Sequence, residues 1–243
     1  MSKETAYEVE LRDLTLGYEG PLLKHVSARF TTGVTGIIGN NGKGKSTLLK
    51  TICGLLTPQS GKIIFNGKEL TDMTSQERAR TVSFSPSSNA ITFPLSVHEL
   101  VSMGRYPYIN QWAGLSPADE GIVSRAIEIC GMRPFRDKKV NTLSDGERQK
   151  VFIAKLLAQE TPVMLLDEPT AFLDYSSKKY FFNLMKEVAF ERHKIILISS
   201  HDIDFLTAYT SNLLMIEDDE TVAFGTTAEL TTSEYFRKHF TRG

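Results

Sequence analysis

The chain has 243 residues, 41% of them hydrophobic, which is enough for one large or two small domains with a sizeable core. Its 28 Lys and Arg residues and 29 Asp and Glu residues give a formal net charge of -1, so no basic field indicates a nucleic-acid partner. The polar start "MSKETAYEVE" has no signal-peptide core, no apolar run approaches the roughly 18 residues of a membrane span, and Cys53 and Cys130 are expected to be reduced core residues of a cytosolic protein.

The N-terminal segment is rich in strand signals. In "YEVELRDLTLGY" the apolar residues Val9, Leu11, Leu14 and Leu16 are separated by polar ones, and "VSARF" continues the pattern. Asn66-Gly67 in "KIIFNGKEL" is typical of a tight hairpin turn. The sequence therefore predicts a β-rich N-terminal part.

The segment "IIGNNGKGKSTLL", residues 37–49, has the spacing of a phosphate-binding loop. Gly39, Gly44, Lys45 and Ser46 fit the pattern Gly-x4-Gly-Lys-Ser/Thr. Glycines let successive backbone N–H groups point at one anion, and a helix that begins near Lys45 adds its positive N-terminal end. Lys45 is therefore predicted to bind the β- and γ-phosphates of a nucleotide, and the Ser46 hydroxyl to bind Mg²⁺.

The flanking residues favour this interpretation over a glycine-rich turn, which is the alternative. "VTGII" before the loop is a short strand-like run, and the apolar residues after the loop recur at helical spacing: Leu48, Leu49, Ile52 and Leu56. The Lys43 side chain, on the crest of the loop, is expected to be solvated. Nucleotide contacts are expected from Gly39, Asn40, Asn41, Gly42, Lys43, Gly44, Lys45, Ser46 and Thr47.

Helix signals dominate from about Ser85 to Gln159. Three helix starts are predicted, at Ser96 with Glu99, at Ser116 with Pro117, and at Ser144 with Glu147. Buried strands "VMLL" and "KIILIS" follow, with the helical "SSKKYFFNLMKEVAF" between them. This alternation predicts a mostly parallel sheet covered by helices. No linker separates independent domains, so we expect one domain over 1–243.

A second half of the nucleotide site is predicted in "VMLLDEPT". The strand over 163–166 is expected next to the phosphate loop, with Asp167 at its end as a Mg²⁺ ligand. Glu168 is placed to polarise an attacking water as general base. The alternative is an acidic turn closed by Pro169.

The segment "TLSDGERQKVFIAKLLAQ" predicts a helix capped by Ser144, with Glu147 completing a capping box. Its buried stripe is expected to be Val151, Ala154, Leu157 and Ala158. Gly146 in the first turn weakens the helix, so capping alone does not explain it. A helix start with a serine hydroxyl and an unhindered backbone also receives phosphate.

"LSDGERQK" resembles the signature motif of ATP-binding cassette (ABC) proteins, usually LSGGQ/E-R-Q, with Asp145 in place of the first glycine. The resemblance covers essentially the whole chain. It implies an α/β fold with a P-loop NTPase (RecA-like) core of mainly parallel sheet and an N-terminal antiparallel β-subdomain, together over 1–85 and 163–243. An α-helical subdomain is implied over 86–162.

The resemblance also assigns residues to the nucleotide. It implies that Tyr18 stacks on adenine, that Asp174 in "AFLD" touches the opposite site, and that His201 in "ISSHD" contacts the γ-phosphate as a third catalytic residue beside Glu168 and Lys45. Turn packing for Tyr18 and a structural histidine are the alternatives. In this family Ser144, Gly146 and Glu147 bind the nucleotide held by the other subunit, which implies a head-to-tail homodimer with two ATP and Mg²⁺ at its interface.

One position departs from the family pattern. The strand "TVSFSP" should be followed by a Gln that reaches Mg²⁺ and the attacking water, and this sequence has Ser87. Three interpretations remain open: Ser87 acts through a bridging water at reduced rate, Asn89 takes the role, or coupling rather than hydrolysis is altered.

The segment beginning "PLSVHELVSMGRYP" resembles the helical subdomain of importer ATPases for iron-siderophore complexes, haem and cobalamin. An ordinary capped helix ended by Gly104 is the alternative. The resemblance implies two membrane-spanning permease subunits, an external substrate-binding protein and a peripheral location on the cytoplasmic face of the membrane. We expect no regulatory domain after "RKHFTRG". Two other functions stay open: a soluble ABC ATPase of the cluster-assembly or translation type, and an ATP-sensing subunit with impaired hydrolysis. The sequence does not identify the cargo.

Overall fold

The computed structural model describes residues 7–87, 93–109 and 114–240. The N-terminal part forms an antiparallel sheet in the order β2-β1-β4-β5. Its strands are β1 (Val9–Gly17), β2 (Pro21–Phe30), β4 (Ser60–Phe65) and β5 (Lys68–Glu69). Asn66 and Gly67 both have positive φ, 48° and 85°, and Phe65 pairs with Lys68 across them. The predicted hairpin turn is confirmed.

A second sheet has the order β10-β9-β3-β8-β7-β6. All its pairings are parallel except that of β9 with β10. Its strands are β3 (Gly33–Ile38), β6 (Val82–Ser85), β7 (Val163–Asp167), β8 (Ile195–Ser199), β9 (Asn212–Ile216) and β10 (Val222–Thr226). The prediction of a mainly parallel sheet is confirmed.

The strand predicted over 163–166 is β7, and it packs on the helix that begins at the phosphate loop, as expected. In the sheet itself β7 is not the neighbour of β3, because β8 lies between them. Helix α1 (Lys45–Ile52) bridges this separation, because it begins at the loop and packs on β7. Chain order does not predict strand order, since each crossover helix can carry the chain to either side of the sheet.

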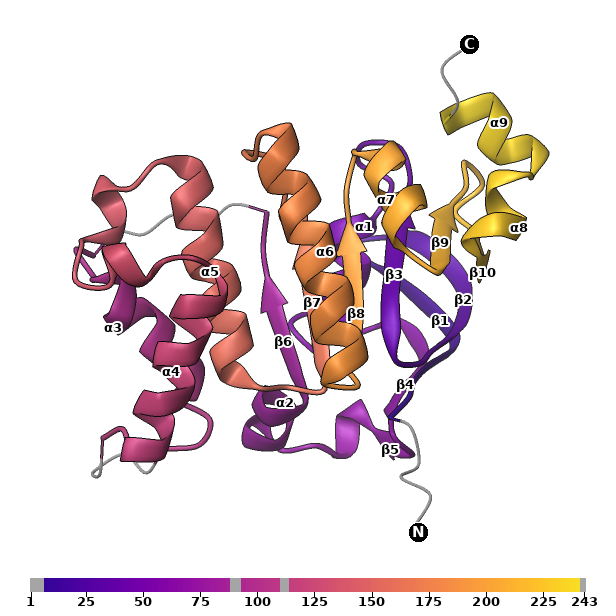
Figure 1. Ribbon diagram of the computed structural model, residues 1–243. Coiled ribbons are helices and arrows are strands. Elements are labelled where there is room, and N and C mark those ends of the chain that lie inside the picture. The colour runs from indigo at the N-terminus through magenta and orange to yellow at the C-terminus, as the bar shows by residue number, and fades with distance from the viewer. Residues whose placement is uncertain (1–6, 88–92, 110–113, 241–243) are drawn as a thin grey trace, which may run out of the picture.

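Both faces of the parallel sheet are buried, each in its own core. Along β7, Met164 and Leu166 belong to one core, and Val163 and Leu165 belong to the other. The first core includes α6 (Tyr175–Glu191) and α7 (Ile203–Tyr209), which cover one face in Figure 1. The second contains α1 and the antiparallel sheet. Successive side chains of this apolar strand therefore point alternately into the cores on the two faces of the sheet.

Three helices pack together beyond β6, at the edge of the sheet (Figure 1). They are α3 (Val97–Ser102), α4 (Pro117–Ile129) and α5 (Asp145–Gln159). All three predicted N-caps, Ser96, Ser116 and Ser144, form capping boxes. The predicted buried stripe of α5 is confirmed. The assignment of 86–162 as a separate subdomain stays a prediction.

The remaining α-helices of the described residues are short. They are α2 (Ser75–Thr81), α8 (Thr227–Thr231) and α9 (Glu234–Phe240). Helix α1 ends at Ile52, so the expectation that its helical stripe reaches Leu56 is wrong. Gly54 adopts a left-handed conformation with φ 76°, which closes the last turn and turns the chain away. No helix in the described ranges is both long and apolar enough to cross a bilayer.

Candidate functional site

The phosphate loop lies between the end of β3 and the start of α1. Its Gly44 has φ 104°, and a Cβ there would lie 3.2 Å from Leu22 Cδ2 and 3.3 Å from Leu23 Cγ. A larger residue would be strained on both counts. The same contact shows that the start of β2, which follows the turn containing Tyr18, lies beside the loop. Tyr18 itself is 64% exposed.

The side chain of Lys45 folds back over the loop and is buried. Its Nζ donates to the carbonyl oxygen of Gly39 at 2.7 Å and to that of Asn40 at 3.4 Å. Burial lowers the pKa of Lys45, and the carboxylates of Glu168 and Asp167 counteract this shift. An ammonium group held by two carbonyl oxygens in a loop of N–H groups is a ready partner for a phosphate.

The Lys43 side chain is 37% exposed, which agrees with the predicted solvation, and it also forms an ion pair that the sequence does not predict. Its Nζ lies 3.3 Å from Asp218 Oδ1, in the turn between β9 and β10, and donates to the Asp218 carbonyl at 3.4 Å. The hydrogen bond from Lys43 lowers the pKa of Asp218. Lys43 therefore connects the phosphate loop with the turn between β9 and β10, 175 residues away in the chain.

Asp167 is the last residue of β7 and is 2% exposed. Its Oδ1 accepts a hydrogen bond from the Ser199 hydroxyl at 2.6 Å, and this hydroxyl also accepts the Glu168 N–H at 3.1 Å. Ser199 ends β8, the strand next to β7. Sequence reasoning missed Ser199, although it stands two residues before His201 in "ISSHD".

Glu168 has an uncommon backbone conformation for a residue with a side chain, with φ 49°. Its Oε2 accepts the His201 backbone N–H at 3.2 Å. Its Oε1 is buried without a hydrogen bond among the described residues, with His201 Nε2 at ion-pair range, 3.2 Å. Burial raises the pKa of Glu168, and the charge of His201 offsets part of that rise. A buried acceptor without a donor is suited to accept a proton from water.

One pocket of about 300 Å³ brings nine of the predicted site residues together. It is lined by Asn41, Gly42, Gly44, Lys45, Ser46, Thr47, Ser87, Glu168 and His201. Ser87 thus lies where the resemblance expects a glutamine. The alternative candidate, Asn89, lies outside the described residues.

The donor set around this pocket fits a nucleotide with Mg²⁺. Within the described residues, no three His, Cys, Asp or Glu side chains gather as a metal site of their own. Mg²⁺ is usually bound through one or two protein carboxylates together with phosphate oxygens and water. The Ser46 hydroxyl and the Asp167 carboxylate, beside a cradle for phosphates, match that preference.

Nine predicted residues do not line this pocket. Four of them stand within two positions of residues that do: Gly39, Asn40, Lys43 and Asp167. The other five are Tyr18, Ser144, Gly146, Glu147 and Asp174. Ser144 and Asp174 are exposed N-caps. The Ser144 backbone N–H and the Ser144 hydroxyl each donate to Glu147 Oε2 at 2.8 Å, and these two bonds lower the pKa of Glu147. In return the Ser144 hydroxyl accepts the Glu147 N–H at 3.3 Å. Asp174 Oδ1 accepts the Ser177 N–H at 2.7 Å.

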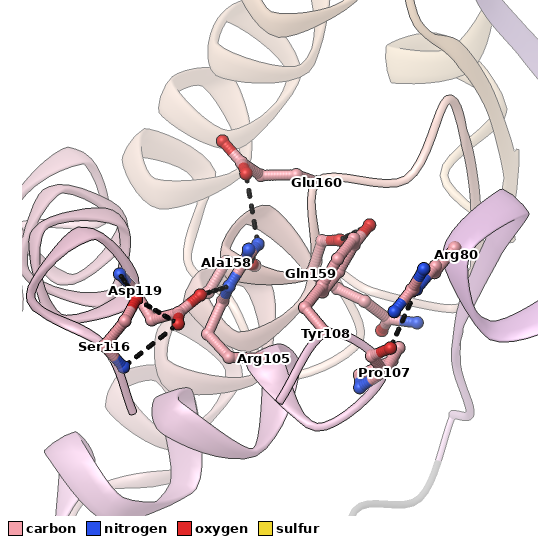
Figure 2. Close-up of polar contacts among 9 residues, drawn as sticks. All are labelled: Arg80, Arg105, Pro107, Tyr108, Ser116, Asp119, Ala158, Gln159 and Glu160. Atoms are coloured by element: carbon pink, nitrogen blue, oxygen red, sulfur yellow. Dashed lines mark hydrogen bonds and ion pairs between the residues drawn. The ribbon is translucent and has the colours of Figure 1, made fainter. Parts of the chain in front are cut away.

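Gly104 and Arg105, in the importer-like segment, hold the turn after α3 against α4 and the end of α5. Arg105 is 5% exposed, and its guanidinium donates to Asp119 Oδ1 at 2.8 Å, to the Ala158 carbonyl at 2.8 Å and to Glu160 Oε2 at 3.0 Å (Figure 2). A Cβ on Gly104 would lie 2.4 Å from the Lys155 carbonyl oxygen. Only glycine lets this turn approach α5 so closely.

The residues after Arg105 extend the same cluster toward α2. The Tyr108 ring lies against the Arg105 guanidinium, with 4.1 Å between the ring centroid and Arg105 Cζ. The Tyr108 hydroxyl donates to the Gln159 carbonyl at 2.9 Å. Arg80 Nε donates to the Pro107 carbonyl at 2.8 Å (Figure 2). The segment therefore fastens α3, α4 and the end of α5 to α2. Helix α3 itself is capped as expected but ends at Ser102, before Gly104.

Several known proteins are similar to this chain. The family described as ABC transporter matches residues 23–171. Achromobactin transport ATP-binding protein CbrD of Dickeya dadantii is 36% identical over 90% of this chain and 82% of its own. Ferric enterobactin transport ATP-binding protein FepC of Escherichia coli is 34% identical over 97% of this chain and 88% of its own. The solved structure of cbiO1 from Clostridium perfringens, part of the ABC transporter complex cbiONQ, has a TM-score of 0.79 at 29% identity and covers 96% of this chain and 94% of that chain.

Proposed function

Because the chain belongs to the ABC transporter family and is an ATPase subunit, we propose that it hydrolyses ATP to power the uptake of an iron-siderophore, haem or cobalamin-type substrate. The observation that carries this proposal is the pocket that joins the phosphate loop to Glu168 and His201. Two relatives are named as transport ATP-binding proteins for achromobactin and for ferric enterobactin, and these names support an iron-siderophore substrate.

The charged and polar side chains in and beside the pocket have distinct tasks in this proposal. Lys45 and the loop N–H groups bind the β- and γ-phosphates, and Ser46 with Asp167 holds Mg²⁺. When bound, Mg²⁺ neutralises the negative charge of the phosphates. Glu168 Oε1 accepts a proton from the attacking water, and His201 contacts the γ-phosphate.

The residues outside the pocket act on a second copy of the chain. Ser144, Gly146 and Glu147 form an exposed helix start that would bind the triphosphate held by a partner subunit. Asp174 would touch the opposite site in the same homodimer. In the proposed importer the dimer lies on the cytoplasmic face of the membrane. There it contacts two permease subunits and is served by an external substrate-binding protein.

Ser87 favours one second candidate, an ATP-sensing subunit with impaired hydrolysis. Its side chain is shorter than the glutamine of the family and lies in the pocket. A soluble ABC ATPase would share every residue of the ATP site, so co-purification with a polytopic membrane protein separates it from an importer subunit.

Steady-state phosphate release by Glu168→Gln tests the assigned chemistry. We expect a fall of at least about 100-fold relative to the unmodified protein, because the amide cannot accept the proton of the water. Glu187→Gln, on the exposed side of α6, is the matched control and should keep the full rate. Equal rates for the unmodified protein and Glu168→Gln would remove Glu168 from the mechanism.

A further inference from the structure

An ion pair beside His201 joins the end of β8 to helix α6. Lys178 Nζ donates to Asp202 Oδ1 at 3.0 Å and lies 2.9 Å from Oδ2. Lys178 is in the opening turns of α6, where its N–H donates to the Asp174 carbonyl at 2.9 Å. Both charged side chains are partly exposed, and such pairs contribute little to folding stability.

Asp202 is also bonded to the loops that follow β7 and β8. Its Oδ2 accepts the Thr170 hydroxyl at 3.1 Å, and its backbone N–H donates to Ser200 Oγ at 3.1 Å. Thr170 is fully buried and stands two residues after Glu168. One carboxylate therefore connects the Glu168 loop, the His201 loop and helix α6.

The His201 side chain stands between two hollows of the surface. It lines the pocket of about 300 Å³ that contains Glu168, and it also lines a second pocket of about 850 Å³. The second pocket has Lys178 and Asp202 in its wall. His201 is about half exposed, so packing alone does not hold its ring toward Glu168. Its orientation depends on the 3.2 Å contact of Nε2 with Glu168 Oε1 and on how firmly the backbone beside it is held.

We propose that Lys178 and Asp202 are positioning residues that hold His201 toward Glu168 and the γ-phosphate. The proposal rests on the proposed ATPase function and adds two residues to it. Without the Lys178 ammonium, the Asp202 carboxylate loses one of its fixed partners, and the loop from 200 to 202 gains freedom. The imidazole then spends more time turned toward the larger pocket. Lys45 and the phosphate loop are untouched by this change.

Steady-state kinetics of Lys178→Met and Asp202→Asn test the proposal. We expect kcat for ATP hydrolysis to fall about tenfold in each, with KM for ATP unchanged, because orientation rather than binding is lost. The double variant should fall no further than either single one, since both break the same contact. Lys178→Arg, which keeps the charge, should restore most of the rate. Lys179→Met, one position along the same helix and exposed, is the matched control.

A His201→Ala background distinguishes positioning from general stability. If Lys178 acts through His201, Lys178→Met has no further effect on kcat once the imidazole is absent. A tenfold loss in that background as well, or equal kcat for Lys178→Met and Lys179→Met, would overturn the proposal. Asp202→Asn keeps the shape of the side chain, so the test stands if Lys178→Met does not fold.

Failure of the proposed function has a different signature. An unmodified protein that binds ATP but releases no phosphate refutes the ATPase chemistry and, with it, any role in positioning. An active unmodified protein with unaffected Lys178 and Asp202 variants refutes the positioning role alone.

Discussion

At the scale of single residues, burial shifts the pKa values of the two buried charged groups of the pocket in opposite directions. It raises the pKa of Glu168 and lowers the pKa of Lys45, so each shifts toward its neutral form. Lys45 and His201 also act on Glu168 and lower its pKa, which favours the carboxylate. A carboxylate with a raised pKa is a stronger base than an exposed one, and this suits proton abstraction near neutral pH.

Replacement of Ser87 is predicted to change the rate of ATP turnover. The Ser87→Gln change adds the amide and the reach that the family pattern has at this position, so we expect ATP turnover to rise about tenfold, the equivalent of ~1.4 kcal/mol in the barrier. Phosphate release by the protein assembled with its permease measures this.

Ser87→Ala is the companion variant, because it removes the hydroxyl that could hold a bridging water. A lower rate for Ser87→Ala shows that the hydroxyl works through water. An unchanged rate for Ser87→Gln would show that the missing glutamine is of no consequence.

At the scale of elements, three helix starts are set by local hydrogen bonds, whereas one helix end is held by contacts that are remote in sequence. Ser96, Ser116 and Ser144 each cap a helix with a partner three residues away. The end of α5, by contrast, is held by Arg105, which contacts the Ala158 carbonyl and Glu160 from a different segment. Capping can be predicted from sequence, whereas this fastening cannot.

Arg105→Met tests how much the cluster in Figure 2 stabilises the protein. The change leaves the buried Ala158 carbonyl and the partly exposed Asp119 carboxylate without their cationic donor. We expect a loss of about 1–3 kcal/mol in the free energy of unfolding, the usual cost of leaving a buried polar group without its partner. Urea unfolding followed by circular dichroism measures it.

Arg125→Met on the exposed face of α4 provides the comparison. It removes the same charge and should change the free energy of unfolding by no more than about 0.5 kcal/mol. Equal losses for the two variants would show that the buried network contributes nothing beyond its charge.

At the scale of the whole molecule, the predicted nucleotide contacts fall into two groups. The phosphate loop, Glu168 and His201 share one pocket, whereas the start of α5 does not line it. In Figure 1 that helix belongs to the group beyond β6, at the edge of the parallel sheet. This separation agrees with a mechanism in which each copy completes the site of the other.

Light scattering on Glu168→Gln tests this arrangement. With ATP and Mg²⁺ we expect the mass to double from the 27.2 kDa of one chain, because the nucleotide is bound but not split and joins the two copies. Without ATP the variant should stay monomeric. A second change, Ser144→Arg, places a bulky side chain on the helix start and should abolish the dimer. Only monomer in the presence of ATP would contradict the proposal.

Much of the fold and part of the site could be predicted before any coordinates. The hairpin at Asn66-Gly67 and the three capping boxes depend on residues that are neighbours in sequence, and all were predicted correctly. The helical stripe to Leu56 was wrong, because the left-handed turn at Gly54 overrides apolar spacing. The ion pair of Lys43 was not predicted, because its partner, Asp218, is remote in sequence.

By itself the sequence determined the phosphate loop, the helix starts and the types of residue available for chemistry. These depend on backbone conformations and hydrogen bonds that span only a few residues. Only the tertiary structure decided that β8 separates β3 from β7, that Ser199 holds Asp167, and that Lys178 and Asp202 flank His201. These contacts form only when segments that are far apart in the sequence pack into one sheet and its covering helices. A local sequence pattern does not specify which distant segments become neighbours.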